Sequence, residues 1–301
     1  MMSSLPFVVI THSKSGASAQ VHPCGATICS FKTSSQRELL FLSREAKLDG
    51  SKAIRGGIPL VFPQFGQPDK SYPQHGFLRD NTWEVDESSK YDNEDAAGLD
   101  FVLTLDKVVK SRGGVWDVGT DLDCKVILSI KIEPSQMTNV LTISNTSGLD
   151  FHFQTLFHTY FKVHGSQAMD NPSCNVTGLE GYAVSDKITN EDYTLGSNPV
   201  HIDGNVDRVY TPPTGKNGVD VVIATGEGTK VQLTASGTVN GSDVAVSAVV
   251  WNPHQEKAKA MIDFGDDEYF DMICVEPGIL SNHPYLSGSN DCVFTQIIKE
   301  L

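Results

Sequence analysis

The stretch LDCKVILSIKI, from Leu122 to Ile132, decides the fold class. All of its even-numbered residues are apolar, whereas its odd-numbered residues include one aspartate and two lysines. An alternation with a period of two is typical of a β-strand that buries one face and exposes the other. The turn residues Glu133-Pro134-Ser135 follow, and after them comes the segment TNVLTISN at 138–145. We therefore predict a hairpin here, with 138–145 as its second strand.

Short runs of the same kind recur along the rest of the chain, separated by turn residues such as Asn240-Gly241-Ser242. The further strands that we expect are Phe7–Ile10, Leu99–Leu105, Val219–Ala224, Lys230–Ala235, Asp243–Trp251, Tyr269–Val275 and Cys292–Ile298. Only residues 36–47 have a helical composition, and their apolar spacing is poor. Because the regular strand–helix alternation of α/β folds is absent, we predict an all-β sandwich or large barrel. We expect a single domain over residues 1–301.

The composition is that of a globular protein with a marked negative charge. The 301 residues are 39% hydrophobic and 20% charged, and 37 acidic against 23 basic residues give a net charge of −14. Such a charge disfavours nonspecific binding to nucleic acid. If the protein binds an anion, a local cluster of basic side chains must therefore hold it against the overall field.

The cysteines and the N-terminal residues bear on the compartment. The six cysteines form no CxxC pair and are sparse for a disulfide scaffold, so we expect buried thiols in a reducing compartment. The apolar run Leu5–Ile10 is too short for a signal-sequence core or a membrane span. We therefore expect a cytoplasmic protein with no membrane partner, and we expect it to be a monomer.

Several common catalytic motifs are absent from the sequence. There is no GxSxG elbow, no GxxxxGK[ST] loop, no HExxH helix and no GxGxxG turn. This removes the usual sequence evidence for a serine hydrolase, a P-loop enzyme, a zincin or a dinucleotide enzyme. His75, His152 and His158 have no carboxylate or cysteine at ligand spacing beside them in the sequence, so we expect no metal and no other cofactor.

Two loops combine arginine with glycine. In RGGIPLVFPQFG, residues 55–66, the paired glycines beside Arg55 let the backbone approach a ligand closely. In QHGFLRD, residues 74–80, His75 and Arg79 can face one cleft, where the guanidinium fork suits a carboxylate or a phosphate. The alternative for both loops is a packed turn with a solvated arginine and a structural histidine.

A third segment, FHFQTLFHTYF at 151–161, also alternates. Read as one strand, it places its phenylalanines on one face and His152, Gln154, His158 and Tyr160 on the other. This second face is polar but uncharged, which favours a sugar-binding or acid–base cleft over simple exposure to solvent. The alternative is a partly buried face whose histidines have structural partners.

Near the C-terminus, the strand DMICV runs directly into Glu276-Pro277-Gly278. We expect Glu276 at the end of that strand, a position that suits a general base, although a glutamate in an ordinary turn is the alternative. Asp207, in NVDRVY, means little by itself.

Taken together, these segments resemble one family. The motifs RGGIPLVFPQFG, QHGFLRDNTWEV, FHTYFKV, DRVY and VEPG occur in that order, and the resemblance extends from about Phe7 to Ile298. The chain is similar to the glucose-6-phosphate 1-epimerases, the hexose-6-phosphate mutarotase branch of the aldose 1-epimerase superfamily. The resemblance implies an all-β, galactose-mutarotase-like β-supersandwich and an isomerase that interconverts the anomers of a hexose 6-phosphate.

The resemblance also implies roles for individual residues. The catalytic residues that it implies are His158 and Glu276. The substrate-binding residues that it implies are Arg55, Gln74, His75, Arg79 and Asp207, with the arginines on the phosphate and Asp207 on the sugar hydroxyls. One departure is Leu78, where the family motif usually has alanine; a larger side chain could crowd the loop but should leave Arg79 in place.

These residues can open and close a pyranose ring. An ionised Glu276 would take the proton of the C1 hydroxyl while a protonated His158 gives a proton to the ring oxygen, and rotation about C1–C2 before closure yields the other anomer. We expect the carboxylate to favour the imidazolium, so that activity falls when His158 deprotonates. Two alternatives remain open: an aldose 1-epimerase for neutral sugars, and a non-catalytic protein that binds sugar phosphates.

Overall fold

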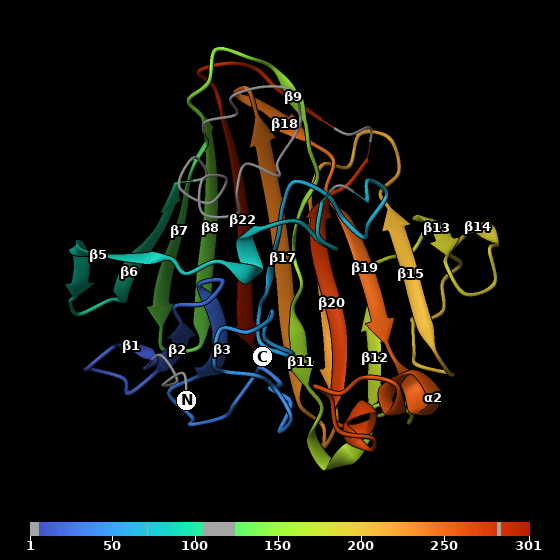
Figure 1. Ribbon diagram of the computed structural model, residues 1–301. Coiled ribbons are helices and arrows are strands. Elements are labelled where there is room, and N and C mark those ends of the chain that lie inside the picture. Colours follow the sequence, from blue (N-terminus) through green and yellow to red (C-terminus); the bar gives the residue numbers. More distant parts are fainter. Residues whose placement is uncertain (1–5, 71, 105–123, 282–283) are drawn as a thin grey trace.

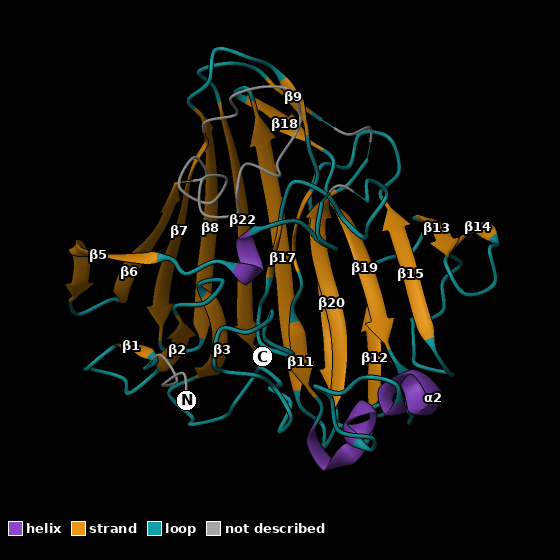
Figure 2. Ribbon diagram, in the orientation of Figure 1, coloured by secondary structure: helices purple, strands orange, loops and turns teal. Residues whose placement is uncertain are grey.

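The computed structural model describes residues 6–70, 72–104, 124–281 and 284–301, and within them the protein consists mainly of β-strands (Figures 1 and 2). Every pairing between the named strands of this part of the chain is antiparallel. This confirms the predicted all-β fold class.

In the described residues, one large sheet contains nine strands, which are β5 (Glu84–Asp92), β6 (Ala97–Thr104), β7 (Cys124–Glu133), β8 (Gln136–Asn145), β12 (Cys174–Thr177), β16 (Val219–Thr225), β17 (Lys230–Val239), β18 (Ser242–Val244) and β22 (Asp291–Glu300). Their order is β12-β16-β17-β22-β8-β7-β6-β5, with β18 also paired to β17. Along β7, β8 and β22 buried residues alternate with more exposed ones, because one face packs inward and the other faces out.

The other large sheet consists of β4 (Leu60–Val61), β10 (Thr155–Phe157), β11 (Tyr160–Lys162), β13 (Ala183–Asp186), β14 (Asp192–Thr194), β15 (Val206–Thr211), β19 (Ser247–Asn252) and β20 (Met272–Ile279). The order is β14-β13-β15-β19-β20-β10-β4, and β11 also pairs with β20. Its central strands β19 and β20 are buried along their whole length, which indicates that both faces of this sheet are covered at its centre.

Smaller elements complete the described chain. A sheet at the N-terminal end contains β1 (Val8–Thr11), β2 (Ser18–His22) and β3 (Thr27–Lys32), and another pairs β9 (Phe151–His152) with β21 (Tyr285–Leu286). The helical elements are the α-helix α2 (His254–Lys259) and the 3-10 turns η1 (Leu78–Asp80), η2 (His164–Ser166) and η3 (Glu268–Phe270). Figure 2 shows them as short pieces beside the strands, with α2 at one end of β15 and β19.

The two large sheets share a hydrophobic core. Leu128 and Phe294 of one sheet belong to the same buried cluster as Phe157 and Val250 of the other. The rings of Phe157 and Phe294 lie 4.9 Å apart between their centroids. All six cysteines are buried as thiols, as expected. None of the described helices is long and apolar enough to cross a bilayer.

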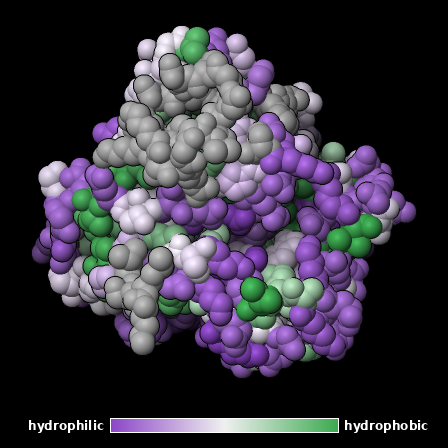
Figure 3. Space-filling view, viewed as in Figure 1, coloured by the Kyte–Doolittle hydropathy of each residue, from purple (hydrophilic) through white to green (hydrophobic). Residues whose placement is uncertain are grey.

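The outer surface has few hydrophobic side chains on one face. On the face drawn in Figure 3, hydrophilic residues predominate and hydrophobic residues form small separate patches. Among the residues coloured on this face there is therefore no large apolar patch for a ligand.

The predicted hairpin is confirmed, because β7 pairs with β8 from Cys124–Asn145 to Glu133–Gln136. Leu122 and Asp123, at the start of the predicted strand, lie outside the described residues. Strands also form at the other predicted places, with boundaries that differ by a few residues.

Two predicted strands need correction. The segment 243–251 is divided between β18 and β19, which belong to different large sheets, because the chain crosses from one sheet to the other at that point. The segment 269–275 begins later, at Met272, because Glu268 forms a 3-10 turn. The Glu268 carboxylate accepts bonds from the backbone N–H groups of Arg44 and Gly265, which stabilises that turn.

Residues 36–47 form no helix and instead make isolated bridges such as Leu40 with Phe161.

Candidate active site

The register of the β20 strand brings the two predicted catalytic residues together. On one flank of β20, Leu156 pairs with Gly278 and Tyr160 pairs with Cys274. The two pairings share one register, so residue 158 falls opposite residue 276. Residues directly opposite in antiparallel strands point to the same face and lie about 4.5–5.5 Å apart at Cβ. A separation of 118 residues in the sequence is therefore closed by β-pairing.

The same registers extend this site across the sheet. Trp251 pairs with Cys274 and Asp207 pairs with Trp251, so one row of residues runs from Tyr160 to Asp207. The next row contains Glu276 and its partner Val249. Because alternate residues of a strand share a face, the two rows present one continuous patch of side chains.

Two details of the sequence interpretation were wrong. The segment 151–161 is not one strand but three short ones, β9, β10 and β11, and His152 is exposed and packs on Tyr285. Glu276 lies in the middle of β20 and not at its end. The ladder between Phe157 and Tyr160 is interrupted opposite Pro277, which has no N–H to donate. This interruption was hidden because the apolar alternation continues across it.

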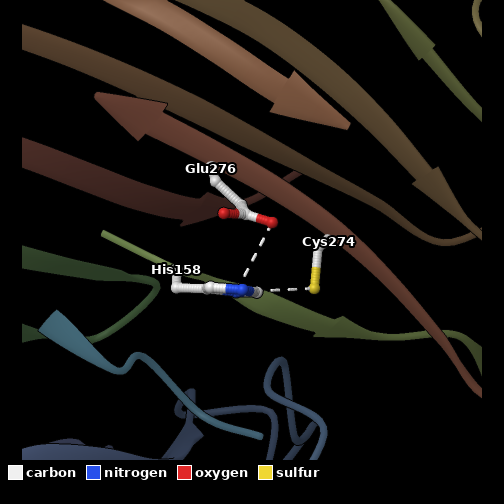
Figure 4. Close-up of side chains that lie close together, drawn as sticks. All are labelled: His158, Cys274 and Glu276. Atoms are coloured by element: carbon white, nitrogen blue, oxygen red, sulfur yellow. Dashed lines mark hydrogen bonds and ion pairs between the residues drawn. The ribbon is translucent and has the colours of Figure 1, made fainter. Parts of the chain in front are cut away.

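The contact between His158 and Glu276 is direct. His158 Nδ1 lies 3.4 Å from Glu276 Oε1 and 3.9 Å from Cys274 Sγ, and Figure 4 shows the imidazole directed toward both side chains. The His158 ring stacks on Tyr160 with centroids 4.9 Å apart and meets the edge of Trp251 at 6.0 Å. Glu276 is 1% exposed, and within the described chain its second oxygen, Oε2, has no hydrogen-bond partner. That oxygen is therefore available to a ligand.

Burial controls the protonation of this pair. It raises the pKa of Glu276 well above the usual range, and the charge of Asp207 raises it further while Arg79 opposes both. It lowers the pKa of His158 well below 6.5, and the neighbouring His75, Arg79 and Arg55 act in the same direction. We expected Glu276 to favour the imidazolium form of His158, and for the protein without a ligand the directions of these pKa shifts contradict that expectation. The pair carries one proton, and burial favours the form in which both groups are neutral.

Cys274 was not expected beside these residues. No cysteine or carboxylate lies near His158 in the sequence, but both types lie near it in the fold. Cys274 and Glu276 are two residues apart on β20, and both contact the imidazole. Burial raises the pKa of Cys274 well above its ordinary value, with the nearby Glu276 acting in the same direction. The thiol therefore keeps its proton at neutral pH.

The first glycine-rich loop places Arg55. Gly57 has a φ of 65° and packs so closely on the backbone of Ile28 that a Cβ would collide with it. Arg55 donates from Nη1 to the hydroxyl of Tyr160 at 3.2 Å, and its Nη2 lies 3.4 Å from Asp263. The Asp263 carboxylate is 2% exposed and also lies 2.9 Å from Nζ of Lys52. The guanidinium is thus fixed from two sides.

The second loop places His75 and Arg79. Gly76 has a φ of 75°, and a Cβ there would collide with the carbonyl of Phe62. His75 Nδ1 accepts a hydrogen bond from the N–H of Gly66 at 3.1 Å. Burial, with the charges of Arg79 and Arg55, lowers the pKa of His75 to about 3. His75 is therefore neutral, carries its proton on Nε2, and can donate one hydrogen bond.

The loop tolerates its unusual leucine. Leu78 is fully buried in the main hydrophobic cluster, and its carbonyl accepts a bond from the indole of Trp83 at 2.9 Å. Arg79 turns the other way and donates from Nη2 to the carbonyl of Gln74 at 2.7 Å. The larger residue therefore fills the core side of the loop and leaves the arginine in place, as expected.

These residues line one cavity of about 640 Å³, which is large enough for a hexose phosphate. Its wall includes all seven residues to which the resemblance assigns a role, namely Arg55, Gln74, His75, Arg79, His158, Asp207 and Glu276. Of the polar face predicted in 151–161, Gln154 also lines the cavity, whereas His152 and Tyr160 do not. At one end Lys257 lies 3.9 Å from Asp207 and 5.5 Å from the centre of the Trp251 ring. Burial raises the pKa of Asp207, although Lys257 and Lys187 oppose it.

The sequence interpretation missed several residues of this site. They are Lys187, Val249, Trp251, Lys257 and Met261 on the wall, and Asp263 behind Arg55. For Trp251 a signal was available, because it alternates with Val249 in a predicted strand and shares its face. For Lys257 and Asp263 there was none, since Lys257 lies in α2 and Asp263 follows that helix, in a segment without a recognisable motif.

Comparison with known proteins identifies relatives over nearly the whole chain. The family model described as aldose 1-epimerase matches residues 7–286. A protein from Cenchrus ciliaris with the name "Putative glucose-6-phosphate 1-epimerase" is 33% identical over 260 residues, which cover 86% of this chain and 74% of that protein. A protein of the same name from Escherichia coli (strain K12) is 26% identical over 300 residues, which cover 99% and 91%.

A solved structure confirms the architecture. The crystal structure of a "putative mutarotase" from Salmonella typhimurium superimposes with a TM-score of 0.77 at 21% identity, covering 98% of this chain and 92% of that one. At this level of identity the likeness establishes the fold alone. The predicted galactose-mutarotase-like β-supersandwich is therefore confirmed.

Proposed function

This chain belongs to the aldose 1-epimerase family, and from that premise we propose that it interconverts the α and β anomers of a hexose 6-phosphate, with glucose 6-phosphate as the first candidate. The observation that carries the proposal is the presence of Arg55 and Arg79 in the same cavity as the His158–Glu276 pair. A mutarotase for neutral sugars needs the pair, whereas two guanidinium forks on one cavity wall suit a doubly charged phosphate better than an uncharged hydroxyl group.

The electrostatics of the two arginines support an anionic substrate. Burial lowers the pKa of Arg79, and the charge of Arg55 lowers it further, against the opposing charges of Asp80, Tyr160 and Asp263. Both guanidinium groups line one partly enclosed cavity, where two like charges disfavour each other. A phosphate dianion would remove this repulsion and accept charge-assisted hydrogen bonds from both guanidinium forks. Salt screens the net charge of −14 beyond about 10 Å, so the local cations govern binding.

The proton on the His158–Glu276 pair accounts for both halves of the reaction. For ring opening, His158 carries the proton: Glu276 accepts the C1 hydroxyl proton, the bond from C1 to the ring oxygen breaks, and His158 protonates that oxygen. The pair is then neutral, and the sugar is an open-chain aldehyde that can rotate about C1–C2. For closure the roles reverse, since neutral His158 takes the proton of the attacking hydroxyl and Glu276 protonates the aldehyde oxygen.

Burial favours the form of the pair in which both His158 and Glu276 are neutral over the form in which both are charged. The neutral pair accompanies the open-chain aldehyde, so the low dielectric of the site stabilises the intermediate relative to the ring forms. Each positioned acid or base typically contributes about 10²–10⁴-fold to the rate. No redox step is required, since the sugar enters and leaves at the same oxidation level.

The remaining wall residues suit a sugar. His75 can donate from Nε2 to a substrate oxygen, and Asp207 can accept from a hydroxyl group. Gln74 lies exposed at the rim, where its amide can bind a hydroxyl. The apolar faces of Trp251 and Val249 can pack on the C–H groups of the ring.

The test is anomer-resolved NMR exchange on glucose 6-phosphate and glucose with the purified protein. The double variant Arg55→Ala with Arg79→Ala should lose kcat/KM for the phosphosugar, because a charge-assisted hydrogen bond contributes about 1.5–3 kcal/mol, or roughly 10–150-fold per arginine. The activity on glucose should change little. Arg44→Ala, an exposed arginine outside the cavity, is the matched control.

Two outcomes would contradict the proposal. If the double variant lowers turnover of both sugars equally, the arginines support the fold or the chemistry and not the phosphate. If the wild-type protein exchanges glucose as fast as glucose 6-phosphate, it acts on neutral aldoses.

A further inference from the structure

Three donor atoms of different chemistry meet at the catalytic pair. His158 Nδ1, Cys274 Sγ and a carboxylate oxygen of Glu276 all lie within 4.8 Å of one another, and all three residues are buried (Figure 4). Only the imidazole and the carboxylate have a part in the proposed proton transfers. The Cys274 thiol is neither the acid nor the base, since the interconversion of the two anomers needs only one of each.

Backbone hydrogen bonds hold the segments that carry these three atoms. His158 lies between β10 and β11, where its N–H donates to the carbonyl of Pro59 and the next carbonyl, of Thr159, accepts from the N–H of Val275. Cys274 and Glu276 are two residues apart on β20 and so share a face. Residue 158 lies opposite Glu276 in the register set by β10 and β11, and Tyr160 lies opposite Cys274. The positions of the donor atoms are therefore restrained on both sides by backbone hydrogen bonds.

The distances are close to those of a tetrahedral metal site. Zinc binds imidazole and carboxylate at about 2.0–2.2 Å and thiolate at about 2.3 Å, which places neighbouring donor atoms roughly 3.3–3.6 Å apart. The Nδ1–Oε1 distance is 3.4 Å, and the Nδ1–Sγ distance is 3.9 Å. All three donor atoms lie within 4.8 Å of one another, so the widest separation must shorten by about 1 Å, which rotation of the Cys274 and Glu276 side chains can supply.

A second observation points to a ligand at this place. The Oε2 atom of Glu276 is buried and has no hydrogen-bond partner among the described residues, and Glu276 lies on the cavity wall. A buried carboxylate oxygen without a partner is costly unless something in the cavity binds it. The cavity also gives an ion a path to the site, because His158 and Glu276 both line it.

We propose that His158, Cys274 and Glu276 form an inhibitory binding site for a thiophilic divalent cation, with Zn²⁺ as the probe. The cation would bind Nδ1, Sγ and a carboxylate oxygen, with its fourth position open to the cavity. It would displace the thiol proton and the proton of the His158–Glu276 pair into solvent, so that neither group could exchange protons with a sugar. The sulfur ligand selects Zn²⁺ or Cd²⁺ over Mg²⁺ and Ca²⁺, which prefer oxygen.

Binding is tested without reference to activity. Protein freed of metal with EDTA is titrated with Co²⁺, and the thiolate-to-metal charge-transfer absorption is recorded. We expect one ion per chain and the growth of this band. Competition with Zn²⁺ then gives the Zn²⁺ affinity, which should fall at least about tenfold in Cys274→Ala, since even the loss of an outer-shell partner can cost 10–100-fold.

The control variant is Cys292→Ala, which removes another fully buried strand thiol and should leave binding unchanged. Near-ultraviolet circular dichroism checks the fold of each variant, and Cys274→Ser provides a second substitution if alanine unfolds the protein. A Zn²⁺ affinity in the Cys274 variants equal to that of the wild type would overturn the proposal.

The inhibitory role rests on the proposed function and has its own test. Zn²⁺ should abolish anomer exchange by the wild type, Mg²⁺ should not, and excess EDTA should restore the activity fully. Loss of activity in EDTA with recovery on adding Zn²⁺ would make the metal a cofactor and would overturn the inhibitory role. If the protein exchanges no sugar at all but still binds one Co²⁺ through Cys274, the site stands and the proposed activity fails.

Discussion

The Glu276 carboxylate, which we propose as the catalytic base, lies in an unfavourable environment. It is buried, it faces His158 at 3.4 Å, and its pKa is raised by burial. We predict that Glu276→Gln lowers kcat for anomer exchange by about 10²–10⁴-fold, because an amide of the same shape cannot accept the C1 proton. NMR exchange measures the rate. A loss of only a few-fold would exclude Glu276 as the base.

The same substitution should stabilise the fold above pH 4.5. In the unfolded chain Glu276 releases its proton near 4.5, whereas in the native state its raised pKa retains the proton. The unfolded state therefore binds fewer protons, and the contribution of Glu276 to stability falls as pH rises from 4.5 toward the folded pKa. Glutamine has no such dependence. Urea unfolding of both proteins at pH 4.5 and pH 8 should give a stability difference that favours the variant and grows with pH.

The pH profile should follow the single proton of the His158–Glu276 pair. A second proton inactivates the pair at the lowered pKa of His158, so the acid limb should lie below 6.5. Loss of the last proton inactivates it at the raised pKa of Glu276, so the alkaline limb belongs to the pair and not to histidine alone. We predict a broad plateau of kcat that includes pH 6.5; kcat is the quantity to follow, because kcat/KM also reports the ionisation of the free substrate phosphate near pH 6. An activity change centred at 6.5, as for an ordinary imidazole, would contradict this account.

At the scale of the elements, a polar bridge between the large sheets fixes the segment that carries His158. Gln296 of β22 donates to the hydroxyl of Thr159 at 2.6 Å and accepts from the amide of Asn139 in β8 at 3.2 Å. All three side chains are fully buried. The bridge lies behind the interruption between β10 and β11, so it holds the backbone next to His158 where no strand ladder does.

We predict that Gln296→Leu destabilises the protein by about 1–3 kcal/mol, because the buried groups of Thr159 and Asn139 lose their partner. The kcat should fall as well, since His158 is then less well positioned opposite Glu276. Urea unfolding and NMR exchange measure the two effects. The matched control is Gln232→Leu on the neighbouring strand β17, whose exposed bond to Asp220 should contribute less than about 0.5 kcal/mol.

The strands also show where the pattern of apolar residues is enough to predict secondary structure. The hairpin of β7 and β8 could be predicted because one face is buried and the other is exposed, which leaves a pattern with a period of two. The pattern fails over residues 151–161, where every second residue is apolar but the chain forms three strands. It also gives no boundary within the fully buried strands β19 and β20, since both of their faces are covered.

The candidate site was predictable to the extent that its residues lie in motifs. Arg55, His75 and Arg79 stand beside glycines that the loops require, and this local signal is visible in the sequence. The environment of Cys274 and the ion pair of Asp263 with Arg55 depend on contacts between distant segments. Burial is likewise a property of the assembled sheets, and for this reason the raised pKa of Glu276 and the lowered pKa of His158 could not be deduced from the motifs.

At the scale of the whole molecule, the charge distribution contrasts with the site. The chain carries a net charge of −14, yet the cavity collects four basic side chains, those of Arg55, Arg79, Lys187 and Lys257. We infer one domain over the chain, because a single buried cluster contains residues of both large sheets and of the N-terminal strands. The cavity wall joins the loops before β5 to strands of the C-terminal half, so a bound ligand would link distant parts of that domain.

We therefore predict that glucose 6-phosphate raises the melting temperature of the whole protein. At about 100 times its Kd a ligand stabilises the native state by about 2.7 kcal/mol. At roughly 2 °C per kcal/mol for a chain of this size, the shift should be about 5 °C. Glucose at the same concentration should give a much smaller shift, because it makes no contact with the arginines.

Variants separate binding from chemistry in this assay. The shift should persist in Glu276→Gln, which retains the arginines, and should disappear in the double variant Arg55→Ala with Arg79→Ala. Inorganic phosphate should give a partial shift that follows the same dependence on the arginines. Equal shifts from glucose and glucose 6-phosphate would place the binding energy in the sugar contacts of Asp207, His75 and Trp251, and the chain would then be a mutarotase for neutral aldoses.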